Sequence, residues 1–313
     1  MTQATLADEW LAKGLVLFNS NEYEKAIMAY EQAIRIVPQS AEAWARKGDA
    51  LYALDRYGEA VSAYDTALQN NPVIAAAWLN KGIILNKLNQ PENALIAIEK
   101  VIAINPDDPN AWYNKGVALY LLGKFDESII AFDQALALNP AAGKVWTKKG
   151  DALQKLGRYK PALKAYDSAV RSDAGYIRAW CNKGSALMDM DLFDESVQAF
   201  DAAIRIDPNN SVAWHDKGNA LLKSGKYRDA LRAFVRATEL DPENAAAWFD
   251  RGMALIKIER KQDAAQAFQH AVQADPQFTK AWKNLGMTLD DLGRHDEAVN
   301  AYRQVTSLNP DAK

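Results

Sequence analysis

The sequence predicts an all-α protein built from nine copies of one helical hairpin. All nine tryptophans of the 313-residue chain are spaced 34 residues apart, from Trp10 to Trp282. A glycine follows each tryptophan by four residues, and a leucine follows it by seven. Offsets of zero, four and seven lie on one face of an α-helix, so each repeat is expected to begin with a helix that buries this face.

A turn is predicted eleven residues after each tryptophan. The residues at this position are Asn21, Asp55, Asn89, Gly123, Gly157, Asp191, Gly225, Glu259 and Gly293. All except Glu259 are of types that tolerate the left-handed conformation that closes a helix. This position therefore separates the first helix of each repeat from a second one.

The second helix has its own apolar stripe. In the fourth repeat, Phe125, Ile129 and Phe132 are spaced by four and three residues, so they share one helix face. Acidic residues such as Glu127 gather near its expected start, where the helix dipole favours negative charge. Proline ends most repeats, as at Pro140, because it cannot continue a helix.

The glycine inside the first helix requires a packing explanation. A glycine at such a position costs about 1 kcal/mol relative to alanine. Alanine or serine recurs sixteen residues after each tryptophan, as Ala26 and Ser128 illustrate. We expect the two helices to approach closely at the glycine, with the backbone of the second helix facing it.

The repeats fill residues 7–312 as a single array. Their predicted boundaries are 7–40, 41–74, 75–108, 109–142, 143–176, 177–210, 211–244, 245–278 and 279–312.

Composition argues against several classes of function. The net charge is -3 with 25% charged residues, so neither nucleic acid nor a membrane is expected as a partner. The chain has no apolar run of eighteen residues and no leader-like amino terminus, which predicts a cytoplasmic protein. One cysteine and three scattered histidines form no metal-ligand pattern, and no catalytic group recurs, so we expect no cofactor and no enzymatic activity.

Together, the tryptophan, glycine, leucine, small residue, aromatic residue and proline at a period of 34 resemble the tetratricopeptide repeat (TPR) family. The resemblance covers all nine repeats, with local departures such as Ala174 for proline and Ile98 for the aromatic residue. It implies a right-handed superhelical α-solenoid of antiparallel helix pairs. In such a solenoid the first helices line a concave groove, and stability is roughly additive by repeat and interface.

Several variable positions of the first helices are apolar near the amino terminus. These residues are Leu11, Leu15, Phe18, Tyr52, Leu79, Ile83, Tyr113, Val117 and Tyr120. An exposed patch of this kind indicates a protein partner. The alternative is that the first repeats cover these residues among themselves.

A basic group follows this patch. Its members are Lys144, Lys148, Lys155 and Arg178. Some TPR domains hold the carboxyl terminus of chaperones with a carboxylate clamp, and Asn114, Lys144 and Lys148 resemble three of its five positions. Leu79 and Ile83 occupy the other two, so the resemblance is incomplete. The alternative is a solvated basic face.

Asparagine recurs two residues after the tryptophan, as Asn80, Asn114 and Asn182. An amide there offers a donor and an acceptor to an extended peptide backbone. The row resembles the asparagine ladder in the TPR arm of the O-linked N-acetylglucosamine transferase. The alternative is that each amide bonds to nearby backbone.

A lysine precedes the glycine in the first seven repeats, from Lys13 to Lys217. This row suggests one of two arrangements. The lysines could form a phosphate-binding stripe or, as we favour, the aliphatic part of each side chain lies along apolar surface and its ammonium group stays in water.

The sequence thus favours a non-catalytic scaffold that binds a protein or peptide segment in the concave groove. Two alternatives stay open. The array could be the targeting arm of a longer enzyme such as a glycosyltransferase, or a structural array that self-associates end to end.

Overall fold

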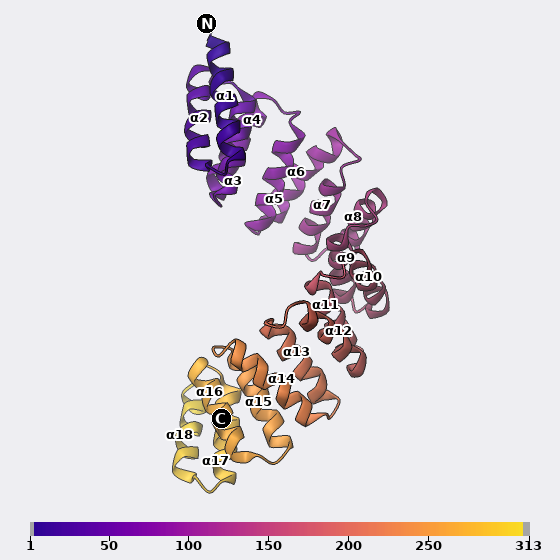
Figure 1. Cartoon of the computed structure of the whole chain (residues 1–313), viewed down its shortest axis with the longest axis vertical. Coiled ribbons are helices and arrows are strands. Elements are labelled where there is room, and N and C mark those ends of the chain that lie inside the picture. The colour runs from indigo at the N-terminus through magenta and orange to yellow at the C-terminus, as the bar shows by residue number, and fades with distance from the viewer. Residues whose placement is uncertain (1–2, 309–313) are drawn as a thin grey trace. The chain divides into compact units, whose positions relative to one another are not determined.

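The chain is all-α in residues 3–308, the part that the structure describes. This computed structural model has eighteen helices and no strand there (Figure 1). The first nine are α1 (Gln3–Asn19), α2 (Tyr23–Ile36), α3 (Ala41–Ala53), α4 (Tyr57–Asn70), α5 (Ala75–Lys87), α6 (Pro91–Ile104), α7 (Pro109–Leu121), α8 (Phe125–Leu138) and α9 (Gly143–Lys155). The others are α10 (Tyr159–Ser172), α11 (Ile177–Met188), α12 (Phe193–Ile206), α13 (Ser211–Lys223), α14 (Tyr227–Leu240), α15 (Ala245–Lys257), α16 (Lys261–Ala274), α17 (Thr279–Asp291) and α18 (His295–Leu308). None of these helices is long and apolar enough to cross a bilayer.

The helices form two compact units, residues 1–157 and residues 158–313. Within each unit every helix packs on the next one along the chain, which gives the expected solenoid of helix pairs. The division falls inside the predicted fifth repeat, 143–176, so a single array of nine repeats stays a prediction. Pro310 and the end of the predicted ninth repeat lie outside the described residues.

The predicted turn positions are confirmed. All nine have a positive φ, between 56° and 78°. Glu259, the one residue whose type does not favour this conformation, adopts it as well, at 64°. The turn therefore imposes the left-handed backbone whether or not the residue favours it, and Glu259 carries conformational strain that the glycines at four of the other turns avoid.

The glycine of the first helix makes room for a ring. A Cβ added to Gly116 would lie 2.4 Å from Cε1 of Phe132, which is fully buried. The atoms nearest to this position belong to the side chain twenty residues after the tryptophan, and at Gly82 a facing backbone atom, the carbonyl oxygen of Ala94, also lies 3.5 Å from an added Cβ. The small residue does lie beside the glycine: the hydroxyl of Ser196 donates to the carbonyl of Gly184 at 2.8 Å.

The tryptophans share one environment. In the described residues, eight indole Nε1 groups donate to the carbonyl oxygen of the residue six positions earlier, at 2.8–3.0 Å. Trp180 makes this bond to Ala174, where the other repeats have proline. Each indole therefore ties the start of a first helix to the loop before it, and the loop does not need proline for this bond.

Candidate functional site

The first helices of the first unit form a continuous row, and α11, α13 and α15 form a row in the second unit. Direct contacts join α1 to α3, α3 to α5, α5 to α7 and α7 to α9, and in the second unit α11 to α13 and α13 to α15. The second helices show no contacts of comparable extent with each other in residues 3–308. We use the name first-helix face for one set of side chains on these helices. It comprises the residue two positions before each tryptophan and the residues one, two, five and eight positions after it.

The predicted apolar patch on this face is mostly part of the repeat packing. Leu15 is 42% exposed, and the other apolar residues of the patch are half-buried. Leu11, Phe18 and Tyr52 pack against one buried cluster, and Tyr113 packs against another. The exposed part of each side chain lies on the first-helix face, and the buried part packs between neighbouring helices.

A polar network joins the second and third repeats on the first-helix face. Oδ1 of Asp49 accepts hydrogen bonds from the Tyr64 hydroxyl at 2.7 Å and from Nδ2 of Asn80 at 3.0 Å. The Arg46 guanidinium lies 3.6 Å from the other oxygen, Oδ2. Two donors therefore orient the carboxylate through one oxygen and leave the second oxygen with a single long ionic contact.

Burial dominates the electrostatics of this network. It raises the pKa of Asp49 above its ordinary value, against the opposing effect of the hydrogen bonds from Tyr64 and Asn80. Burial and the neighbouring carboxylate also raise the pKa of Tyr64, so its hydroxyl stays a donor. The network is thus a partly desolvated acceptor with fixed geometry.

A pocket of about 330 Å³ opens beside this network, between α3 and the start of α5. Ala45, Ile74 and Ala77 contribute apolar walls, while Arg46 and Asp49 contribute opposite charges. Ala45, Arg46 and Asp49 occupy variable positions of the first-helix face. The pocket can therefore accept an apolar group together with a hydrogen-bond donor for Asp49 Oδ2.

The remaining predicted site residues are spread over both units. Asn114 is buried, and its Nδ2 donates to the carbonyl of Asn110 at 2.8 Å, as in the alternative of local backbone bonding. Lys144 is exposed, whereas Lys148 lies 3.5 Å from Asp151 and over the ring of Tyr120. These residues belong to the first unit.

The second unit contains Arg178, which is exposed, and Asn182, which is half-buried. Leu79, Ile83 and Val117 are half-buried on the first unit's face.

The second unit carries a different polar group on its first-helix face. Nε2 of His215 lies 2.8 Å from Oδ2 of Asp250, which joins α13 to α15. Burial raises the pKa of Asp216, and burial together with Asp216 raises the pKa of Cys181 to about 11. The thiol is therefore protonated at neutral pH and a poor nucleophile. No group of side chains in the described residues could hold a metal ion.

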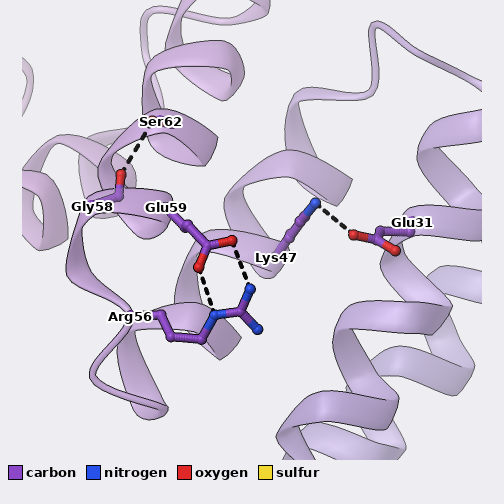
Figure 2. Close-up of polar contacts among 6 residues, drawn as sticks. All are labelled: Glu31, Lys47, Arg56, Gly58, Glu59 and Ser62. Atoms are coloured by element: carbon purple, nitrogen blue, oxygen red, sulfur yellow. Dashed lines mark hydrogen bonds and ion pairs between the residues drawn. The ribbon is translucent and has the colours of Figure 1, made fainter.

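The lysine row forms ion pairs with the preceding repeat, which the sequence pattern had not led us to expect. We call this set the lysine–acid ladder: Lys47–Glu31, Lys81–Asp65, Lys115–Glu99, Lys149–Asp133, Lys183–Asp167 and Lys217–Asp201. Figure 2 shows Lys47 Nζ directed at Glu31, 2.8 Å away. Each lysine also lies over the tryptophan of its own repeat, 5.1–5.6 Å from the ring centroid.

The ladder corrects the expected arrangement of wet ammonium groups. Its lysine side chains are only 19–26% exposed, because an indole and a carboxylate cover each one. The signal was present in the sequence, since an acidic residue stands 21 positions after the tryptophan in each of the first six repeats. The ladder is therefore an internal connection between repeats and offers no cationic stripe to a ligand.

Family models of the tetratricopeptide repeat match most of the chain. One matches residues 11–72, 46–109, 147–211 and 215–277, and a second matches residues 109–141 and 279–312. With its helix pairs, turn glycines and buried rings, the chain belongs to the tetratricopeptide repeat family.

Solved structures agree with this fold. The C-terminal part of a TPR repeat-containing protein from Cytophaga hutchinsonii is 19% identical with a TM-score of 0.62, over 75% of this chain and 96% of that one. A tetratricopeptide repeat protein from Parabacteroides merdae is 18% identical with a TM-score of 0.60, over 80% and 99%. The MamA protein is 23% identical with a TM-score of 0.50, over 56% and 96%. These likenesses show the fold. No curated protein sequence matches the chain.

Proposed function

We propose that the chain is a non-catalytic scaffold that binds a peptide segment of a partner protein on the first-helix face of residues 1–157. The observation that carries the proposal is the pocket between α3 and α5, where apolar walls surround the oriented carboxylate of Asp49. An apolar side chain of the peptide enters the pocket, and a peptide N–H donates to Asp49 Oδ2. The half-buried edges of Tyr52, Leu79 and Ile83 extend the contact.

The direction of the peptide is set by charge. Lys144, exposed at the start of α9, attracts an acidic residue or a terminal carboxylate of the segment. The half-buried lysines of the ladder make no contribution, because each already has a carboxylate partner. Affinity therefore depends on a few pocket residues and not on the overall charge of the chain.

The test is a peptide library selected on the full chain, followed by titration of the best peptide. Ala45→Leu fills the pocket without changing any charge, and Asp49→Ala removes the acceptor. We expect each to weaken binding by about tenfold or more. Ala137→Leu adds the same bulk on the exposed side of α8 and serves as the matched control.

The wider face is tested with Asn114→Ala and Lys144→Glu. Loss of affinity for Lys144→Glu supports the assignment of peptide direction. A peptide that binds equally well to Ala45→Leu, Asp49→Ala and the unchanged chain would remove the pocket from the binding site, and a library that yields no binder would contradict the function itself.

A further inference from the structure

The lysine–acid ladder stops before the last two repeats, and the first interface without it is the one between the seventh and eighth repeats. In the eighth repeat Arg251 replaces the lysine, and Val235 stands where each of the first six repeats has an acidic residue. Arg251 still lies over the tryptophan of its own repeat, with its guanidinium carbon 4.8 Å from the centroid of the Trp248 ring. The cation of the ladder is therefore retained here while its carboxylate is missing.

Arg251 is incompletely satisfied. One nitrogen, Nη1, donates to the hydroxyl of Thr238 at 3.1 Å. Nε is buried and has no hydrogen-bond partner among the described residues. No carboxylate of residues 3–308 forms an ion pair with this guanidinium. Burial accordingly lowers the pKa of Arg251 below its ordinary value, although Glu239 and Asp263 oppose this effect from a distance.

The two carboxylates that raise the pKa of Arg251 are engaged by other arginines. Asp263 pairs with Arg260 at 2.6 Å, and Glu239 pairs with Arg236 at 3.1 Å. Neither carboxylate takes the place of the missing ladder acid. Arg251 therefore has no direct ion pair with a carboxylate of residues 3–308.

A pocket of about 150 Å³ lies at the interruption. Its lining includes Arg251, Val235, Leu231 and two stacked rings, Trp248 and His270, whose centroids are 4.4 Å apart. The ion pair of Arg260 and Asp263 also lines the pocket, so the charge of Asp263 is already balanced there. A short acidic side chain suits this arrangement, because its methylene contacts the apolar wall and its carboxylate reaches the guanidinium.

We propose that this pocket binds the carboxylate of an acidic side chain on a partner peptide. The chain itself supplies the template: Asp201 Oδ1 lies 2.6 Å from Lys217 Nζ at the preceding interface, and the incoming carboxylate takes the equivalent place on Arg251. The guanidinium donates a charge-assisted hydrogen bond to this carboxylate. The site is separate from the first-helix face and does not depend on the function proposed for that face.

The ninth repeat offers an internal comparison. There Leu285 replaces the lysine and Gln269 replaces the acid, and a pocket of about 240 Å³ is lined by both residues and Trp282. This pocket lacks the unpaired cation, so a carboxylate has no reason to prefer it. The indole resonances of Trp248 and Trp282 therefore report on two pockets that differ in charge.

The experiment is a nuclear magnetic resonance titration of the full chain, labelled with ¹⁵N. The probes are two capped pentapeptides, Ala-Leu-Glu-Leu-Ala and its twin with glutamine in place of glutamate. We expect the glutamate peptide to shift the Arg251 Nε–H and Trp248 indole resonances and to leave Trp282 unchanged. Arg251→Gln identifies the arginine resonance by its disappearance.

The decisive variant is Val235→Asp, which installs the missing carboxylate within the chain. We expect it to shift the Arg251 resonance without peptide and to weaken binding of the glutamate peptide about tenfold or more. Val235→Asn introduces a side chain of the same shape as aspartate but without its charge, and this variant should retain binding of the glutamate peptide. Equal shifts with the glutamine peptide, or undiminished binding to Val235→Asp when its spectrum is that of a folded chain, would overturn the proposal.

Discussion

The hydroxyl of Tyr64 donates to the carboxylate of Asp49 at 2.7 Å, whereas the hydroxyl of Tyr30, at the equivalent position one repeat earlier, is buried and has no hydrogen-bond partner in residues 3–308. The two tyrosines occupy the same place in the packing and are both fully buried. They therefore form a natural pair in which one hydroxyl is satisfied and the other is not.

Replacing each of these tyrosines by phenylalanine should have opposite effects. Tyr64→Phe removes a donor from a partly buried carboxylate and should destabilise the chain by about 1–2 kcal/mol. Tyr30→Phe removes an unsatisfied polar atom and should be neutral or stabilising. Urea unfolding followed by circular dichroism measures both. Equal losses in the two variants would show that the Tyr64–Asp49 bond has no particular effect on stability.

Asp49 should make stability depend on pH. Its folded-state pKa lies above its ordinary value of 3.8, so the folded chain binds the proton more tightly than the unfolded chain. This contribution to stability is present at low pH and is lost as the pH rises through the raised pKa. The difference in unfolding free energy, Asp49→Asn minus the unchanged chain, should therefore be larger at about pH 7 than at about pH 4.

The control for this measurement is Glu92→Gln, because Glu92 is exposed on the second helix α6. Its difference in unfolding free energy should change little over the same range. A difference for Asp49→Asn that falls with rising pH would contradict the raised pKa.

Gly116→Ala should be strongly destabilising. The added methyl group would lie 2.4 Å from the Phe132 ring, which is enclosed and cannot move aside. We expect a loss of more than about 2 kcal/mol. Gly58→Ala is the matched control, since a Cβ at this helical position meets nothing within 4 Å, and it should stabilise α4 by up to about 1 kcal/mol. Thermal unfolding that ranks the two variants in the reverse order would refute the ring contact.

Glu259→Gly should stabilise the chain by about 1 kcal/mol, because glycine adopts the φ of 64° without strain. The converse change, Gly225→Ala at a φ of 78°, should destabilise it by a similar amount, since no neighbour lies within 4 Å of the added Cβ and only the backbone conformation is affected. Chemical denaturation of both variants separates this effect from packing. If Glu259→Gly is no more stable than the unchanged chain, the strain at Glu259 is relieved by other residues of the turn.

The sequence was sufficient to predict the features that depend on neighbouring residues. The turn at Gly123 and the helix stripe around Phe132 follow from short spacings, so the pattern of residues alone predicts both. The contact between Asp49 and Asn80 could not be predicted, because it depends on the register of α3 against α5. Asn114 illustrates the same limit: its position on the helix was predictable, but the bond to Asn110 depends on which rotamer the surrounding helices allow.

The ion pairs of the lysine–acid ladder were predictable from the sequence, but the pocket at its interruption was not. Lys47 and Glu31 are sixteen residues apart, and the period repeats this spacing six times, so a search for opposite charges at a fixed offset would have found the pairs. The break at Val235 would have appeared in the same search. The pocket beside Arg251 would not, because its volume depends on how the side chains of three helices meet.

The ladder also bears on how the number of repeats can change. Repeats two to six each carry both the lysine and the acid of the ladder, so deleting or duplicating one of them leaves every ladder charge with a counterpart. Val235 and Gln269 break this equivalence toward the carboxyl end. Adding or removing one of repeats two to six therefore costs no ladder ion pair beyond its own, whereas a second copy of the seventh repeat would leave its lysine facing Val235.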